Sequence, residues 1–98
     1  MVETKRIYIN GVWGDSSSGQ VASVVNPATE DVVATVPAGT VEDARAALDA
    51  AEAAFDAWSS LTPLDRAKYL FKAADEMEAV KGDLARTITL EQGKPLYE

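Results

Sequence analysis

Apolar side chains recur at helical spacing through the middle of the chain, between Thr40 and Val80. Two amphipathic stripes follow each other there, each with charged residues on the opposite face. The first stripe consists of Val41, Ala44, Leu48, Ala51, Phe55 and Trp58, and the second of Leu64, Ala67, Leu70, Phe71, Ala74 and Met77. Only the short segment Leu61-Thr62-Pro63 separates them. Because a short connection returns one helix alongside the other, the pattern predicts an antiparallel pair with apolar faces in contact.

Both helices have recognisable first turns. Thr40, with Asp43 three residues later, approximates a capping box, in which each side chain binds the other residue's backbone N–H. Thr62 is placed to cap the second helix, and Pro63 suits its first position because no backbone donor is needed there. These signals place the two helix starts at Thr40 and Thr62.

The residues before Thr40 carry the patterns of strands and turns. β-forming residues flank Asn10-Gly11, a dipeptide that readily takes the positive φ values of a type I′ turn, so a hairpin is expected over 6–13. A polar loop follows over 15–20. Valine-rich strands are expected at 21–26 and 31–36, with a turn that Asn26-Pro27 starts. The predicted fold is therefore α/β, with short β-hairpins followed by the helical pair and further short helices.

The last part of the chain has three further signals. Lys81-Gly82 is expected to break or bend the second helix, and Asp83 to cap a third, shorter one. Gly93 is expected to end this third helix because glycine readily takes the left-handed conformation. Pro95 fits the first turn of another helix.

Composition restricts the chemistry that the chain can perform. The sequence has no cysteine and no histidine, which excludes disulfides, thiolate metal sites, a cysteine nucleophile and the most common general base. Its carboxylate pairs lie on predicted helix faces open to water, where burial does not tune them for acid–base work. The formal charge of -7 argues against nucleic acid or an anionic membrane as a partner. With no long apolar run and no signal-peptide pattern, a cytoplasmic protein is expected.

Five short motifs follow each other along the chain. They are Tyr8-Ile9-Asn10-Gly11-Val12-Trp13, Val24-Val25-Asn26-Pro27-Ala28-Thr29-Glu30, Ala44 to Trp58, Leu61 to Arg66, and Thr89-Leu90-Glu91-Gln92-Gly93-Lys94-Pro95. In this order and spacing, they resemble the N-terminal portion of the aldehyde dehydrogenase superfamily over nearly the whole chain. The last motif is most similar to the succinate-semialdehyde dehydrogenase branch.

The resemblance implies what the complete enzyme would do. Family members oxidise an aldehyde to the carboxylic acid with NAD or NADP, using a cysteine nucleophile and a glutamate base. None of the family's catalytic or nucleotide-binding residues maps onto residues 1–98, which would form an incomplete N-terminal part of the cofactor-binding domain. This chain is therefore not expected to be active by itself. Its partners would be the remainder of the enzyme chain, a small aldehyde such as succinate semialdehyde, and identical subunits of a homo-oligomer.

The resemblance also implies a site for a monovalent cation. Several family members hold a structural Na⁺ or K⁺ through backbone carbonyls before the Asn-Pro turn and an acidic side chain before the Gly-Lys-Pro motif. The corresponding residues here are Val24, Val25 and Glu91. Oxygen ligands suit such hard cations. Many members have aspartate at the acidic position, so the alternative is that Glu91 is an ordinary carboxylate near a helix end.

A second hypothesis comes from another class of protein. The chain could be a free-standing, non-catalytic α+β module that binds a partner protein through its alanine-rich helix faces. A reading frame that continues past Glu98 into a glycine-rich strand–helix unit and a later cysteine favours the enzyme. A stop codon directly after Glu98 favours the module.

Overall fold

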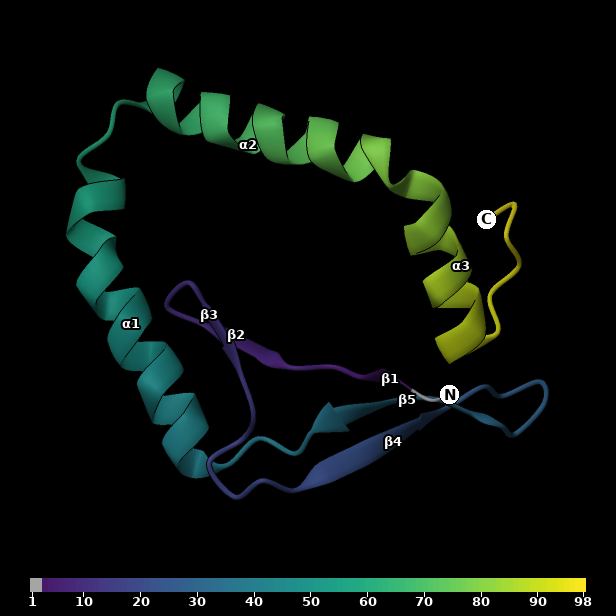
Figure 1. Ribbon diagram of the computed structural model, residues 1–98. Coiled ribbons are helices and arrows are strands. Elements are labelled where there is room, and N and C mark those ends of the chain that lie inside the picture. The colour runs from purple at the N-terminus through teal and green to yellow at the C-terminus, as the bar shows by residue number, and fades with distance from the viewer. Residues whose placement is uncertain (1–2) are drawn as a thin grey trace.

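The computed structural model describes residues 3–98, and within this range short strands precede helices (Figure 1). The strands are β1 (Glu3–Thr4), β2 (Ile7–Ile9), β3 (Val12–Gly14), β4 (Val21–Val25) and β5 (Val32–Pro37). The helices are α1 (Val41–Ser59), α2 (Pro63–Ala79) and α3 (Lys81–Gln92). The predicted α/β class, with strands first and helices after them, is confirmed.

The predicted hairpin is formed by β2 and β3. The two strands are antiparallel, with Tyr8 opposite Trp13, and their rings lie 4.8 Å apart between centroids. Asn10 and Gly11 have φ values of 51° and 79°, as a type I′ turn requires. The prediction from the Asn-Gly dipeptide is therefore confirmed.

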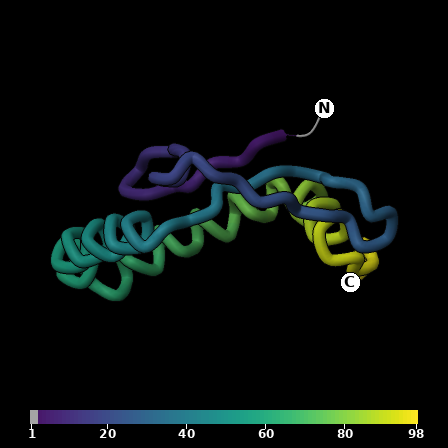
Figure 2. The backbone as a smooth tube through the Cα atoms, turned by 90° about the horizontal axis from the view of Figure 1, so that it is seen from below, coloured from purple at the N-terminus to yellow at the C-terminus, as the bar shows by residue number. Residues whose placement is uncertain are grey.

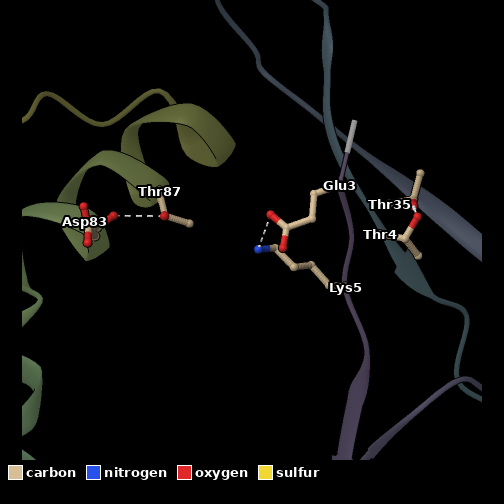
Figure 3. A network of polar contacts seen from close by, with 6 residues as sticks. All are labelled: Glu3, Thr4, Lys5, Thr35, Asp83 and Thr87. Carbon is tan, nitrogen blue, oxygen red and sulfur yellow. Dashed lines mark hydrogen bonds and ion pairs between the residues drawn. The ribbon is translucent and has the colours of Figure 1, made fainter. Parts of the chain in front are cut away.

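The other strands form a three-stranded sheet in the order β1-β5-β4. β4 and β5 are antiparallel, as expected from their connection through the Asn26-Pro27 turn, and β4 lies at the edge of the sheet. β1 was not predicted; it pairs in parallel with β5, placing Glu3 opposite Ala34. A hydrogen bond of 2.8 Å from the Thr35 hydroxyl to the Thr4 hydroxyl joins the two strands (Figure 3). A two-residue polar strand has no hydrophobic alternation from which it could be recognised.

The starts of α1 and α2 agree with their capping signals. Thr40 and Asp43 form a reciprocal capping box at α1, and the Thr62 hydroxyl accepts the backbone N–H of Asp65 at α2. Pro63 is the first residue of α2. Both predicted helix starts are therefore confirmed.

The third helix begins earlier than Asp83. Val80 occupies the position before its first turn and provides no side-chain cap, so the predicted capping role of Asp83 is wrong. Asp83 lies inside the first turn, and its backbone carbonyl accepts a 2.9 Å hydrogen bond from the Thr87 hydroxyl (Figure 3). Gly93 ends the helix with a φ of 82°, as predicted. At Pro95, where another helix start was expected, the structure has only a turn, closed by the N–H of Glu98.

The predicted packing of α1 against α2 is wrong. Figure 1 shows the two helices meeting at an open corner, and α3 continuing from the far end of α2. Three side chains expected at the helix interface are largely exposed: Leu48 at 70%, Phe55 at 63% and Phe71 at 72%. Instead, α1 contacts the hairpin strand β2, and α3 contacts β4. The amphipathic stripes were identified correctly, but they do not face each other.

The molecule is a thin plate with principal extents of 48 × 37 × 18 Å. Seen from below, the strands lie on one side of this plate and the helices on the other (Figure 2). Between residues 3 and 98, no hydrophobic side chain is buried, and the buried residue is Ser16, at 6% exposure. The described chain therefore has secondary structure without a closed hydrophobic core.

Candidate functional site

A polar cluster joins the loop after β3 to the first turn of α1. The Asp43 carboxylate accepts the backbone N–H of Thr40 at 2.9 Å and that of Ser17 at 3.1 and 3.2 Å to its two oxygens. The hydroxyls of Ser17 and Thr40 are 2.5 Å apart. The backbone hydrogen bond from Thr40, supported by the one from Ser17, holds the pKa of Asp43 below its ordinary value of 3.8. Because these groups satisfy one another, the cluster attaches the loop to α1 and leaves no group poised for chemistry.

The residues expected at the cation site lie on two segments that the fold brings together. Val24 and Val25 end the edge strand β4, and Glu91 lies exposed in the last turn of α3. The two segments meet just beyond these residues, since a Cβ atom added at Gly93 would lie 3.1 Å from Cγ of Pro27. The described residues contain no group of three or more acidic or other metal-binding side chains. Any ion here would therefore depend on backbone carbonyls.

An open, mainly apolar groove of about 590 Å³ runs along the junction of α2 and α3 beneath the C-terminal turn. Its apolar lining includes Met77, Leu84, Ile88 and Leu96. The charged residues of its lining, such as Lys81, are exposed. This arrangement suits contact with another protein segment better than it suits catalysis.

Large apolar side chains also remain uncovered along the helices. We call this set the helical apolar surface; it comprises Leu48, Phe55, Leu64, Leu70, Phe71 and Met77, each more than 60% exposed. Soluble domains bury most side chains of this kind, and an accumulation of exposed ones marks a surface that another protein or protein segment covers. None of the helices in the described part of the chain is long and apolar enough to cross a membrane.

A family model described as "Aldehyde dehydrogenase family" matches residues 13–98. The chain belongs to the aldehyde dehydrogenase family. The resemblance that the five sequence motifs indicated is thereby confirmed.

Curated relatives include several semialdehyde dehydrogenases. The glutarate-semialdehyde dehydrogenase of Pseudomonas putida is 44% identical over 94 residues, covering 96% of this chain and 20% of the relative. The NADP(+) succinate-semialdehyde dehydrogenase of Escherichia coli is 46% identical over 94 residues, with the same shares covered. The chain thus spans about one fifth of the length of these relatives.

Solved aldehyde dehydrogenase structures contain the same fold. An aldehyde dehydrogenase from Bartonella henselae superposes with a TM-score of 0.93 at 34% identity, covering 99% of this chain and 20% of that one. A structure described as an Escherichia coli NADP dependent enzyme gives a TM-score of 0.92 at 42% identity, with 96% and 20% covered. The architecture described above is therefore that of an N-terminal segment of the aldehyde dehydrogenase fold.

The polar contacts of this aldehyde dehydrogenase segment were only partly visible in its sequence. The Thr40–Asp43 pair was recognisable from its spacing, but the participation of Ser17 was not, because it comes from a loop 26 residues before Asp43. The hydrogen bond from the Arg66 guanidinium back to the carbonyl of Ser59 was not predicted either. Reaching seven residues back across the α1–α2 connection is not a spacing typical of contacts within one helix.

Proposed function

We propose that this chain forms the N-terminal segment of an NAD(P)-dependent aldehyde dehydrogenase that oxidises an aldehyde to the carboxylic acid. Support for the cofactor comes from structural neighbours such as the betaine aldehyde dehydrogenase of Staphylococcus aureus, whose structure is described as a complex with NAD+. Support for the substrate class comes from relatives named as glutarate-, succinate- and malonate-semialdehyde dehydrogenases. A semialdehyde, in which an aldehyde and a carboxylate share one small molecule, is therefore the proposed substrate of the complete enzyme.

The observation that carries this proposal is that residues 3–98 form helices and strands but no closed hydrophobic core. The helical apolar surface and the exposed valines of β4 and β5 have no partner among residues 3–98. In relatives five times as long, four fifths of the protein is available to cover such surfaces. We propose that residues 1–98 are an incomplete, non-catalytic part of the cofactor-binding domain and form its outer layer.

The other partners are proposed on the same basis. The remainder of the enzyme chain would cover the helical apolar surface, and the complete protein would assemble with identical subunits in the cytoplasm. Nucleic acid is not proposed as a partner, because the acidic balance of the sequence opposes binding to phosphate backbones. The free-standing module remains the alternative that the experiment below must exclude.

A monovalent cation is the proposed occupant of the junction between β4 and α3. The carbonyls of Val24 and Val25 and the carboxylate of Glu91 would be the ligands from this chain, with further oxygens from the missing part. The contact between Gly93 and Pro27 supports the proposal by joining the two ligand-bearing segments. Glu91 has no ion-pair partner within residues 3–98, so its carboxylate is available.

The cation proposal is tested in a complete enzyme that carries this segment. Replacing tetramethylammonium chloride by potassium or sodium chloride at equal ionic strength should raise the thermal midpoint of the native protein, and less so that of E91Q. The neighbouring substitution Q92E controls for a general change of charge at the end of α3. Equal responses of native and E91Q proteins would show that Glu91 is an ordinary surface carboxylate.

The proposed function is tested by a chimera. This chain replaces the matching segment of the Escherichia coli succinate-semialdehyde dehydrogenase, and formation of NADPH from succinate semialdehyde is followed. The chimera should be soluble and active, because the rest of the enzyme would cover the helical apolar surface. A second chimera with L48S, F55S and F71S should lose activity and solubility together. If the first chimera folds but is inactive, or if the second is as active as the first, the segment does not have the proposed role.

A further inference from the structure

Two side-chain contacts brace the connection between α1 and α2. In the first, Arg66 in the first turns of α2 reaches back to the end of α1. Its guanidinium nitrogen Nη1 donates to the carbonyl of Ser59, at 3.3 Å, and to the carbonyl of Leu61. In the second, the rings of Trp58 and Tyr69 meet edge to face with centroids 5.7 Å apart. The connection is therefore a braced corner and not a free linker.

The need for such a brace follows from the end of α1. The last carbonyls of a helix have no partners within it, and they carry the partial negative charge of the helix dipole. The last turn of α1 contains no basic residue that could compensate this charge. Arg66 provides a positive charge from the next helix, through its hydrogen bond to the carbonyl of Ser59.

The brace also determines how the two helices can be oriented. Thr62 and Pro63 begin α2 immediately after the connection, so Arg66 lies only about one turn into the helix. Both hydrogen bonds come from one nitrogen, Nη1, and they reach the carbonyls of Ser59 and Leu61, which lie on either side of Ser60 in the connection. Because they tie the first turns of α2 to the end of α1, they restrict rotation of α2 about the corner. Folding α2 back alongside α1 would break these hydrogen bonds.

From these contacts we propose that Arg66 is a positioning residue that holds the α1–α2 corner open and prevents the two apolar stripes from pairing with each other. The brace explains why two amphipathic helices with a three-residue connection do not form an antiparallel pair. Its purpose rests on the proposed function: an open corner leaves Leu48, Phe55 and Phe71 available to the rest of the enzyme. The geometric role of Arg66 does not depend on that function.

The corner can be measured directly, because the chain has no cysteine. Spin labels are attached at D49C on α1 and D75C on α2, both exposed, and the distance between them is measured by double electron–electron resonance in the otherwise unchanged 98-residue chain. The native corner should give one narrow distribution at long distance. R66M should shift it to shorter distances and broaden it, and R66K, which keeps a charged donor, should restore part of the native distribution.

Matched measurements keep the result interpretable. R45M makes the same change on the exposed face of α1 and should leave the distances unchanged. Far-ultraviolet circular dichroism checks that the helices persist, and R66Q, which retains polar donors without charge, replaces R66M if helical signal is lost. An unchanged distribution in R66M or R66Q, or a short distance in the native chain, overturns the role of Arg66. An active chimera combined with unchanged distances would overturn this role alone and leave the proposed function standing.

Discussion

The backbone of Gly93 lies directly against the ring of Pro27. A Cβ atom added at Gly93 would be 3.1 Å from Cγ of Pro27, and Gly93 has a φ of 82°. Two requirements therefore meet at one residue: the left-handed end of α3 and close contact with the turn that follows β4. This contact attaches the last helix to the sheet.

G93A should destabilise the chain and loosen this attachment. The left-handed conformation alone costs a residue with a Cβ about 1–2 kcal/mol, and displacement of the proline ring adds to that. G82A is the matched control, because Gly82 lies in α3 with open space around its Cα. There, alanine should stabilise the helix by about 0.5–1 kcal/mol. Urea unfolding followed by circular dichroism measures both; equal effects of the two substitutions would contradict this account of Gly93.

The Thr40–Asp43 capping box predicts a stability that depends on pH. The folded chain lowers the pKa of Asp43, so the carboxylate's contribution is fully present above the unfolded value of 3.8 and is lost as the pH falls through the folded value. D43N should remove this part of the dependence, whereas T40A should lower stability at neutral pH by about 0.5–2 kcal/mol through loss of the cap. Unfolding measured from neutral to acidic pH tests both. A native pH profile unchanged by D43N would contradict the contribution of Asp43.

Exposed aromatic residues on α1 should contribute little to the stability of the isolated chain. F55A should change the free energy of unfolding by less than about 1 kcal/mol, since the side chain is 63% exposed. W58A should lower the free energy of unfolding by more, because it removes the ring contact with Tyr69. Aromatic pairs of this kind contribute about 0.5–1.5 kcal/mol beyond the area they bury. A loss of about 3 kcal/mol or more for F55A would indicate that its ring is covered in solution.

The features that could be predicted from the sequence are those set by neighbouring residues. Asn10-Gly11 specifies its turn and Thr62-Pro63 its helix start through the conformations that these residues prefer locally. The orientation of α1 and α2 could not be predicted in this way. An amphipathic stripe shows that a face will be covered but not by what, and here the covering surface is not among residues 3–98. From the sequence of this chain alone, each apolar stripe was expected to be covered by the other one, which led to the prediction of an antiparallel pair.

The candidate cation site could likewise be predicted only in part. The motifs around Asn26-Pro27 and Gly93-Lys94 were recognised, and the structure brings their segments into contact. The ligand role of Val24, Val25 and Glu91 stays a prediction, because the remaining oxygens would come from outside the chain. Interactions within a few residues follow from the sequence, whereas a site shared with another part of a protein does not.

The isolated chain should not catalyse aldehyde oxidation. Its sequence has neither cysteine nor histidine, and Gly11, Gly14 and Gly19 belong to a hairpin and a loop with no helix directly after them to hold a phosphate. Purified chain mixed with NAD or NADP and a semialdehyde should produce no reduced cofactor, and calorimetry should detect no cofactor binding. Stoichiometric binding of NAD would show that a nucleotide site had been missed.

Hydrogen exchange tests the central claim, that this segment is completed by the rest of an aldehyde dehydrogenase, most directly. An isolated hairpin is marginal in water, and the valines of β4 and β5 lack cover, so the isolated chain should protect its amides mainly over 41–80. In the chimera with the Escherichia coli enzyme, slow exchange should extend from Ile7 to Ile88. Slow, uniform protection from Ile7 through Ile88 in the isolated monomer would contradict the account and favour a free-standing module.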